Sequence, residues 1–436
     1  MDFTSAQMAY ILFGVFMLLM TLGVPIMVAL GMAAMACFIV SGTDLSVMIH
    51  MGASAMTSFP LMALPSFVLA GALMEAAGIS RRLVSIAENI VGPMPGGLAV
   101  STVVACLFFG SISGSGPATA AAVGMLMIPA MMRRGYNAGY ASAAAATAGG
   151  IGIVLPPSIP HVIYGVVGQQ SIAKMFLGGV IPGLMIALTL SLTHLFLCRN
   201  NPPDGKTWSF GMLLESLRKG IWSLLAPVLI LGGIYTGKFT PTEAAIVTCF
   251  YTLFVGIFIH REITFKSFMA SLKTTSWLTG RVLVIVFTAI AFGRILTEYR
   301  IPIEIANWIL GYTDNVYIVW FFVVTLLLFV GMFMEILALI LLVTPVLLPV
   351  MVAYGVDPIH FGVVLICCCA IGLSTPPLGE NLFITSGIAR VSYEEGTIKA
   401  LPMIFMNILL LILLVAFPQL VLWLPNTLMP PIVPGG

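Results

Sequence analysis

Long stretches of this chain contain no charged residue, and two of them set the main constraint on its fold. They run from Asn89 to Met132 and from Gly135 to Ala173, and each exceeds the roughly 20 residues with which one helix crosses the hydrocarbon core of a bilayer. Only 8% of the 436 residues are charged, whereas a soluble domain carries about 25%. We therefore expect an all-α, polytopic membrane protein in which each of these stretches folds back or breaks within the bilayer.

Short charged clusters separate the apolar stretches, and about ten to twelve membrane segments are expected between them, some too short to span. No lysine or arginine precedes Arg81 and none follows Lys399, so both termini are expected outside the cytoplasm. The polar loop 199–219 holds four basic residues and is the expected cytoplasmic loop. The amphipathic stretches 208–222 and 262–277 are expected to lie along that surface as interfacial helices.

Two function classes find no support in the composition. The net charge of +2 comes from basic residues scattered over loop ends, so no nucleic-acid partner is expected. The seven cysteines form no CxxC pair, which favours buried hydrophobes over a metal or disulfide site.

A constant spacing relates the two halves of the chain. The prolines of IGIVLPPS at 151–158 return 220 residues later in IGLSTPPL at 371–378. The same offset pairs Pro129 with Pro349, Gly135 with Gly355, Gly152 with Gly372, and Pro182 with Pro402. This pattern favours an internal duplication. Interrupted apolar segments at corresponding places in two halves indicate a secondary transporter built from inverted repeats, with its site near the membrane midplane.

The first proline break predicts a buried polar site. Non-helical backbone survives in hydrocarbon only where protein or a water-filled cavity surrounds it. Carbonyl groups freed by proline can bind a hard cation, and the N-terminus of the following half-helix attracts an anion. Ser158 begins that half-helix and His161 lies about one turn on, so both suit an anionic or hydroxylated ligand. An ordinary N-cap for Ser158 and a structural role for His161 remain alternatives.

The stretch GSISGSGPAT at 110–119 lies midway along the first uncharged run, and a re-entrant hairpin with this tip is expected. Ser111, Ser113 and Ser115 supply hydroxyl groups, and the glycines supply accessible carbonyl groups. Such an oxygen-rich environment suits sodium or another hard cation. The alternative is an interface of small residues between packed helices.

The corresponding part of the second half contains an acid among apolar residues. Glu335 lies in GMFMEILAL at 331–339, and an intramembrane carboxylate is a functional candidate by default, although it also suits a structural contact with backbone N–H groups. The second break, STPPLGEN at 374–381, adds four polar side chains: Ser374, Thr375, Glu380 and Asn381.

These motifs resemble a known family. The segments GSISGSGPATAAAVGMLMIPAMMRRGY, GGIGIVLPPSIPHVIYG and TPPLGENLFITSGIA are similar to the large membrane (M) subunit of tripartite ATP-independent periplasmic (TRAP) transporters, and the resemblance covers nearly the whole chain. It implies inverted repeats with two re-entrant hairpins and two broken helices, arranged as an elevator-type scaffold and a mobile transport domain. Scaffold helices are expected at 1–96 and 222–313, the transport domain at 97–198 and 314–436, and a cytoplasmic loop with an interfacial helix at 199–221.

The resemblance also implies partners, cargo and site residues. The partners are a separate small four-helix (Q-type) membrane subunit, a periplasmic (P-type) substrate-binding protein and the lipid bilayer of the bacterial inner membrane. The cargo is a carboxylate, with sialic acid as the first expectation and C4-dicarboxylates next, coupled to sodium ions. The expected sodium ligands are Ser111, Ser113, Gly150, Gly152 and Pro156 in the first half, and Glu335, Gly372, Thr375 and Pro376 in the second. The expected substrate contacts are Ser115, Ser158, His161 and Asn381.

Other functions fit the sequence less well. Proton coupling through Glu335 or His161 is the nearest alternative to sodium coupling, followed by an ion channel. An intramembrane hydrolase with a serine of GSISGSG as nucleophile lacks the G-x-S-x-G elbow and leaves the duplicated breaks unexplained. The chain contains no GxxxxGK[ST] motif, so it is not expected to be an ATPase or another enzyme.

Overall fold

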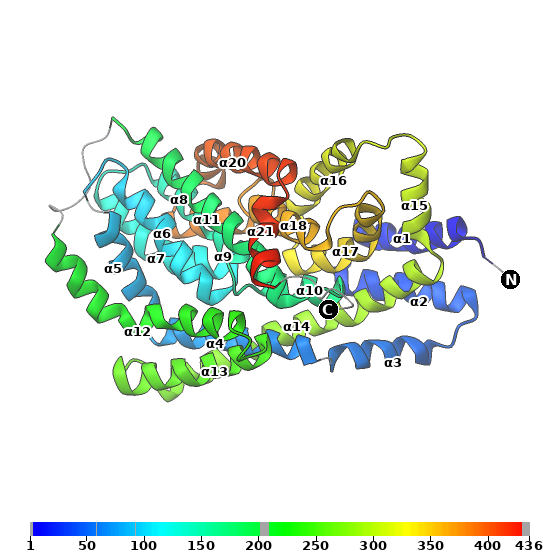
Figure 1. The fold of residues 1–436 in the computed structure, drawn as a ribbon, viewed down its shortest axis with the longest axis horizontal. Coiled ribbons are helices and arrows are strands. Elements are labelled where there is room, and N and C mark those ends of the chain that lie inside the picture. The colour runs from blue at the N-terminus through cyan, green and yellow to red at the C-terminus, as the bar shows by residue number, and fades with distance from the viewer. Residues whose placement is uncertain (1–2, 58, 92, 201–208, 430–436) are drawn as a thin grey trace.

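A computed structural model describes residues 3–57, 59–91, 93–200 and 209–429, and this part of the chain is helical with short connections (Figure 1). The first helices are α1 (Ser5–Thr21), α2 (Ile26–Ser41), α3 (Leu45–Met56), the 3₁₀ turn η1 (Phe59–Met62), α4 (Ala63–Ala76) and α5 (Ile79–Val91). They are followed by α6 (Gly97–Ser113), α7 (Gly116–Arg133), α8 (Ala138–Gly149), α9 (Ile151–Val154), α10 (Ile159–Val167) and α11 (Ile172–Leu197).

The second half repeats this density of helices. It begins with α12 (Phe210–Tyr235), α13 (Pro241–Phe254), the π-helical turn η2 (Val255–Ile259), α14 (Phe265–Glu298), α15 (Ile301–Leu310) and α16 (Val316–Gly331). It ends with α17 (Ile336–Ala353), α18 (Pro358–Gly372), α19 (Glu380–Ala389), α20 (Tyr393–Ala416) and α21 (Gln419–Leu428).

The lengths and hydropathy of the helices confirm a multi-pass membrane protein. Six helical segments in the described chain are long and apolar enough to cross a bilayer: α11, α12, α13 with η2, α14, α17 and α20. Two bent pairs raise this number to as many as eight, namely α4 with α5 at 71° and α8–α9 with α10 at 42°. Shorter apolar helices, among them α6, α16 and α18, correspond to the expected segments that are too short to span.

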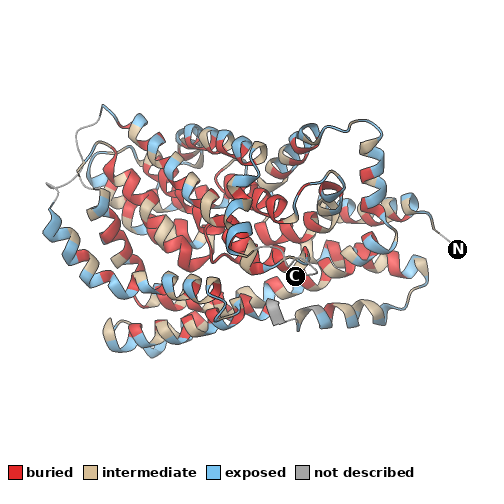
Figure 2. Cartoon of the chain, in the orientation of Figure 1, coloured by how far each residue is buried: buried red, intermediate tan, exposed pale blue. Residues whose placement is uncertain are grey.

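The most deeply buried helices are α8 and α18, which begin 220 residues apart. Every residue from Ala141 to Gly149 and from Ile359 to Gly372 is buried. Figure 2 shows these central helices largely buried, whereas α3, α12 and α13 at the edge carry many exposed residues. Asn137 caps α8 through its contact with the Tyr140 N–H (2.9 Å), and Asp357 caps α18 at the equivalent position. A small-residue helix core inside an apolar outer surface suits a protein that exposes its periphery to lipid.

The basic stretches 208–222 and 262–277 differ from the expected interfacial helices. Each forms the first part of a long helix, α12 or α14, which continues into the apolar region without a break. Neither junction contains a proline, and extending a helix satisfies backbone groups that a break within hydrocarbon would leave unpaired. The expected boundary at 221/222 therefore falls inside α12, whereas the boundaries near 96, 198 and 313 fall at or near helix ends.

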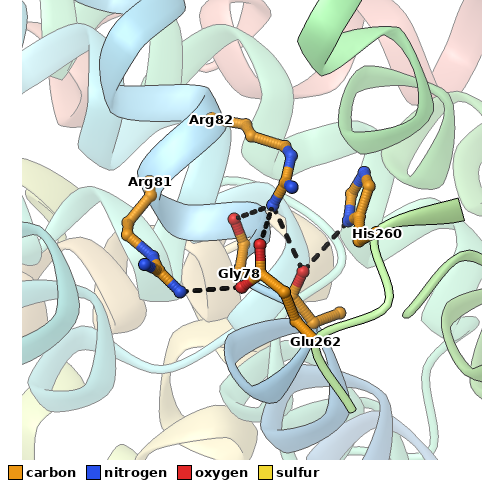
Figure 3. Close-up of polar contacts among 6 residues, drawn as sticks. Gly78, Arg81, Arg82, His260 and Glu262 are labelled. Atoms are coloured by element: carbon orange, nitrogen blue, oxygen red, sulfur yellow. Dashed lines mark hydrogen bonds and ion pairs between the residues drawn. The ribbon is translucent and has the colours of Figure 1, made fainter. Parts of the chain in front are cut away.

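An ionic cluster braces the bend between α4 and α5 (Figure 3). Glu262, in the connection before α14, pairs with Arg81 at 2.7 Å and with Arg82 at 2.9 Å. Arg82 Nη1 also donates a hydrogen bond to the Gly78 carbonyl oxygen at 2.9 Å. The cluster thus joins the bend to the segment that leads into α14.

His260 makes a second contact between the same two segments. Its Nδ1 lies 3.0 Å from the Ala77 carbonyl oxygen, which can only accept, so Nδ1 carries the proton. Burial lowers the pKa of His260 below its usual value, and the nearby Arg82 lowers it further, while the bond to Ala77 opposes this shift. The imidazole is therefore neutral at pH 7, and this contact needs no titration to form.

Gly78→Ala is expected to destabilise the protein by about 1–3 kcal/mol. Gly78 has φ of +65°, and a Cβ atom there would lie 2.7 Å from Glu262 Cδ and displace that carboxylate from its arginines. Gly23→Ala is the matched control, because Gly23 also follows a helix end with φ of +77° but has no atom within 4 Å of the added methyl. Thermal unfolding in detergent measures both; equal losses would show that backbone strain alone matters.

Candidate functional site

The first hairpin consists of α6 and α7, and its turn is narrower than the sequence indicates. The helix α6 continues through Ser113, because the Gly114 N–H still donates to the Gly110 carbonyl oxygen at 3.0 Å. Only Gly114, with φ of +62°, and Ser115 lie between the helices. The Ile159 N–H donates to the Gly114 carbonyl oxygen at 3.3 Å, which ties the tip to the start of α10.

Three oxygen atoms gather behind this tip. The hydroxyls of Ser113 and Thr119 are 2.8 Å apart, and Thr119 donates to the Ser115 carbonyl oxygen at 2.7 Å. A Cβ atom on Gly152, in α9, would overlap Thr119 Oγ1 and lie 2.9 Å from the Ser115 carbonyl oxygen. Ser111 is also buried, but its hydroxyl donates to the carbonyl oxygen of Phe108 on its own helix at 2.7 Å. Neutral oxygens in this arrangement are of the type that hard cations bind.

The first break separates α9 from α10 and contains Pro156, which is buried. Gly150, just before it, approaches the second half of the chain, since a Cβ atom there would lie 2.9 Å from the Ala370 carbonyl oxygen. Ser158 Oγ donates to the Ile153 carbonyl oxygen at 2.5 Å across the break. The break is therefore closed by protein contacts on several sides.

The second hairpin repeats this arrangement with α16 and α17. Glu335 occupies the N-cap position of α17. The Leu378 N–H donates to the Met332 carbonyl oxygen at 3.3 Å, which ties this tip to the second break. A Cβ atom on Gly372 would lie 2.6 Å from the Gly331 carbonyl oxygen, so hairpin and break are in backbone contact.

The second break extends from the end of α18 to the start of α19. Thr375 donates through Oγ1 to the Ile371 carbonyl oxygen at 2.6 Å and through its N–H to the Gly372 carbonyl oxygen at 3.0 Å. Pro376 follows and is half-buried. The chain beyond α18 is thus held against the helix end, with the Thr375 hydroxyl close to the backbone of the break.

Three expected residues lie in the packed interior rather than at an open surface. His161 is fully buried, with its ring edge-on to that of Phe176. Asn381 is also fully buried, and its Nδ2 donates to the Ala146 carbonyl oxygen at 3.0 Å. Ser158 is 1% exposed. The structure places these side chains around the breaks, where they stabilise the backbone.

A cleft of about 310 Å³ lies where the two hairpin tips meet α14. Ser115 and Glu335 line it from the two tips, Glu380 from the start of α19, and Trp277 and Arg281 from α14. The first residues of α7, α10, α17 and α19 all lie on its wall. The N-terminus of each helix carries partial positive charge, so the cleft combines four such ends with one guanidinium group.

The guanidinium of Arg281 is free to bind an anion. Its Cζ lies 5.7 Å from the centre of the Trp277 ring. Among the residues that the structure describes, no carboxylate is within 4.0 Å of it. Contact with an aromatic ring leaves the N–H groups at the edge of the guanidinium available for bidentate hydrogen bonds to an oxyanion.

The sequence analysis did not select Arg281, Trp277 or Thr119, and it noted Glu380 without assigning it a role. Arg281 could have been found as an isolated cation at the start of a long apolar run in α14. Of the expected substrate contacts, Ser115 lines the cleft. Glu335, an expected sodium ligand, lines it as well.

Residues 13–420 match the model of the family described as the tripartite ATP-independent periplasmic transporter, DctM component. The chain is 40% identical over 94% of its length to the isethionate TRAP transporter permease protein DctMQ of Oleidesulfovibrio alaskensis, and it spans 65% of that relative. It is 39% identical to the C4-dicarboxylate TRAP transporter large permease protein of Pseudomonas aeruginosa, over 85% of this chain and 87% of the relative. It is 37% identical to the sialic acid TRAP transporter large permease protein of Vibrio cholerae, over 93% of this chain and 95% of the relative.

The fold is similar to the crystal structure of the Alcanivorax borkumensis YdaH transporter. The TM-score is 0.62, and the match covers 86% of this chain and 89% of that chain. The identity is 14%, so the likeness concerns the fold alone.

Proposed function

The chain belongs to the DctM-component family of TRAP transporters, and from this premise we propose that it carries a small organic anion across the bacterial inner membrane together with sodium ions. The observation that supports this function best is the cleft at the hairpin tips. There, four helix N-termini and Arg281 favour an anion, and the oxygen cluster of the first hairpin lies directly behind Ser115.

The proposed sodium sites lie behind the two tips. In the first half, Ser111, Ser113 and the backbone from Gly150 through Gly152 to Pro156 surround one site, and Thr119 joins them because its hydroxyl contacts that of Ser113. In the second half, Glu335 and Thr375 with the backbone of Gly372 and Pro376 surround the other. Hydroxyl, carbonyl and carboxylate oxygens make a donor set that fits a hard cation. Ser115 lies between cation and cleft.

The proposed mechanism is an elevator movement by two related halves. Several positions 220 residues apart have the same structural place: Pro129 and Pro349 lie inside α7 and α17, Gly135 and Gly355 follow these helices with positive φ, and Pro182 and Pro402 lie inside α11 and α20. Their hairpins contact their breaks in equivalent ways. We propose that residues 97–198 and 314–436 move together against a scaffold that includes α14, which supplies Arg281 to the cleft.

The tripartite family description supports two further components. A small four-helix membrane subunit would enlarge the scaffold, and a periplasmic binding protein would deliver the substrate. The relatives are named for isethionate, C4-dicarboxylates and sialic acid, all of them organic anions, so the substrate proposed here is an organic acid of this kind. Both the delivery protein and the sodium gradient would then act on the same cleft.

Reconstituted protein tests this function. Liposomes that contain the chain and its small subunit, supplied with loaded binding protein, are expected to accumulate labelled organic acid only under an inward sodium gradient. The panel contains isethionate, sialic acid and succinate. Equal uptake under a proton gradient without sodium would establish proton coupling instead. Flux that needs no binding protein and runs equally in both directions would indicate a channel.

A further inference from the structure

We propose that the cleft selects small organic monoanions that carry a hydroxyl or ammonium group at their other end, and that it discriminates against dianions. This inference rests on the proposed function, in which the cleft holds the transported anion. It narrows the substrate class to hydroxylated sulfonates, hydroxylated monocarboxylates and zwitterions.

The charges of the lining carry the first step of the argument. Arg281 is the only cation among the described residues that line the cleft, and Glu335 and Glu380 are its two carboxylates. Their formal charges sum to −1. Two sodium ions would bring the total to +1, which one negative charge on the substrate neutralises. A dianion would leave an uncompensated negative charge between apolar helices, which is unfavourable in a low-dielectric environment.

The positions of these groups assign a polarity to the substrate. Arg281 lies on α14, whereas Glu335 and Glu380 begin α17 and α19. A carboxylate or sulfonate placed on the guanidinium edge leaves the other end of the molecule facing carboxylates that only accept hydrogen bonds. A hydroxyl or ammonium group donates to them, while a second carboxylate repels them. Ser115 can serve either end, because its hydroxyl both donates and accepts.

The size of the cleft agrees with a small substrate. Its volume is about 310 Å³, at the lower end of the range for ligand pockets. Trp277, beside Arg281, adds an apolar wall that is 66% exposed. The cleft therefore suits a compact acid with one charged end, one donor end and a short carbon chain between them.

Direct binding tests the selection without the binding protein, which has a specificity of its own. The purified chain with its small subunit is titrated in sodium-containing detergent buffer with isethionate, sialic acid and succinate, and the shift in melting temperature gives the affinities. The monoanions are expected to bind at least tenfold more tightly than succinate. Succinate binding as tightly as the monoanions would overturn the inference and leave the transport function intact. If neither class binds and sodium drives no uptake, both are wrong.

Glu380→Gln provides the second measurement, since it removes one carboxylate from the cleft. Succinate is expected to bind about tenfold more tightly to this variant and the hydroxylated monoanions more weakly, a pair of opposite shifts that a loss of stability does not produce. Glu394→Gln is the matched control, because Glu394 also lies in the first turn of a helix but is exposed outside the cleft. Unchanged discrimination in Glu380→Gln would contradict the role of this carboxylate. If Glu380→Gln does not fold, Glu335→Gln takes its place, and the wild-type comparison remains decisive.

Discussion

Gly372→Ala is expected to reduce uptake more than tenfold, because it forces the second hairpin away from its break. The added Cβ atom would lie 2.6 Å from the carbonyl oxygen and 2.8 Å from the carbonyl carbon of Gly331. Both are backbone atoms, so no side-chain rotation relieves the overlap, and overpacking of this kind costs about 1–3 kcal/mol. Since Gly331 ends α16 just before the tip that carries Glu335, the proposed second sodium site would be displaced with it.

The control for this variant is Gly387→Ala. Gly387 lies in α19, has no positive φ, and has no atom within 4 Å of an added Cβ. It is expected to retain uptake and melting temperature, and alanine can even stabilise a helix at such a position. Sodium-driven uptake and thermal unfolding should be measured on the same preparations. Wild-type uptake by Gly372→Ala would show that close contact between hairpin and break is not needed for transport.

The parts of the fold that the sequence predicted are those with a local cause. Proline and glycine change the backbone at their own positions, so the break after α9 and the end of α18 at Gly372 could be located from the letters alone. Uncharged runs longer than one membrane span predicted the hairpin of α6 and α7. The 220-residue spacing also predicted which positions should be equivalent.

The parts that were missed depend on contacts between distant segments. Arg281 lies about fifty residues from Glu335 in the sequence, and only the packing of α14 against the hairpin region brings both to one cleft. The role of Thr119 depends on the turn at Gly114, which folds α7 back so that its hydroxyl meets that of Ser113. The continuous helices α12 and α14 were mistaken for interfacial pieces, because a charged, amphipathic start looks the same whether or not the helix goes on.

Thr119→Val is expected to raise the sodium concentration for half-maximal uptake about tenfold, as the loss of one oxygen ligand worth about 1–3 kcal/mol implies. Valine keeps the shape of threonine, so packing against Gly152 remains while the oxygen 2.8 Å from Ser113 Oγ is lost. Ser113→Ala removes the other hydroxyl of this pair and is expected to shift the sodium dependence in the same direction. The anion dependence measured at saturating sodium should change much less, because neither side chain lines the cleft.

Thr102→Val separates this effect from the general loss of a buried hydroxyl. Thr102 is fully buried on α6, and its hydroxyl donates to the carbonyl oxygen of Leu98 in the same helix at 2.9 Å, one helix length away from the tip. Its sodium titration is expected to match that of the wild-type chain. If Thr119→Val and Thr102→Val gave the same titration, the oxygen cluster would serve only to hold the hairpin together. A selective shift in Thr119→Val and Ser113→Ala would instead place the cation where hairpin, break and cleft meet, so that sodium binding and closure of the cleft over the anion depend on the same backbone contact.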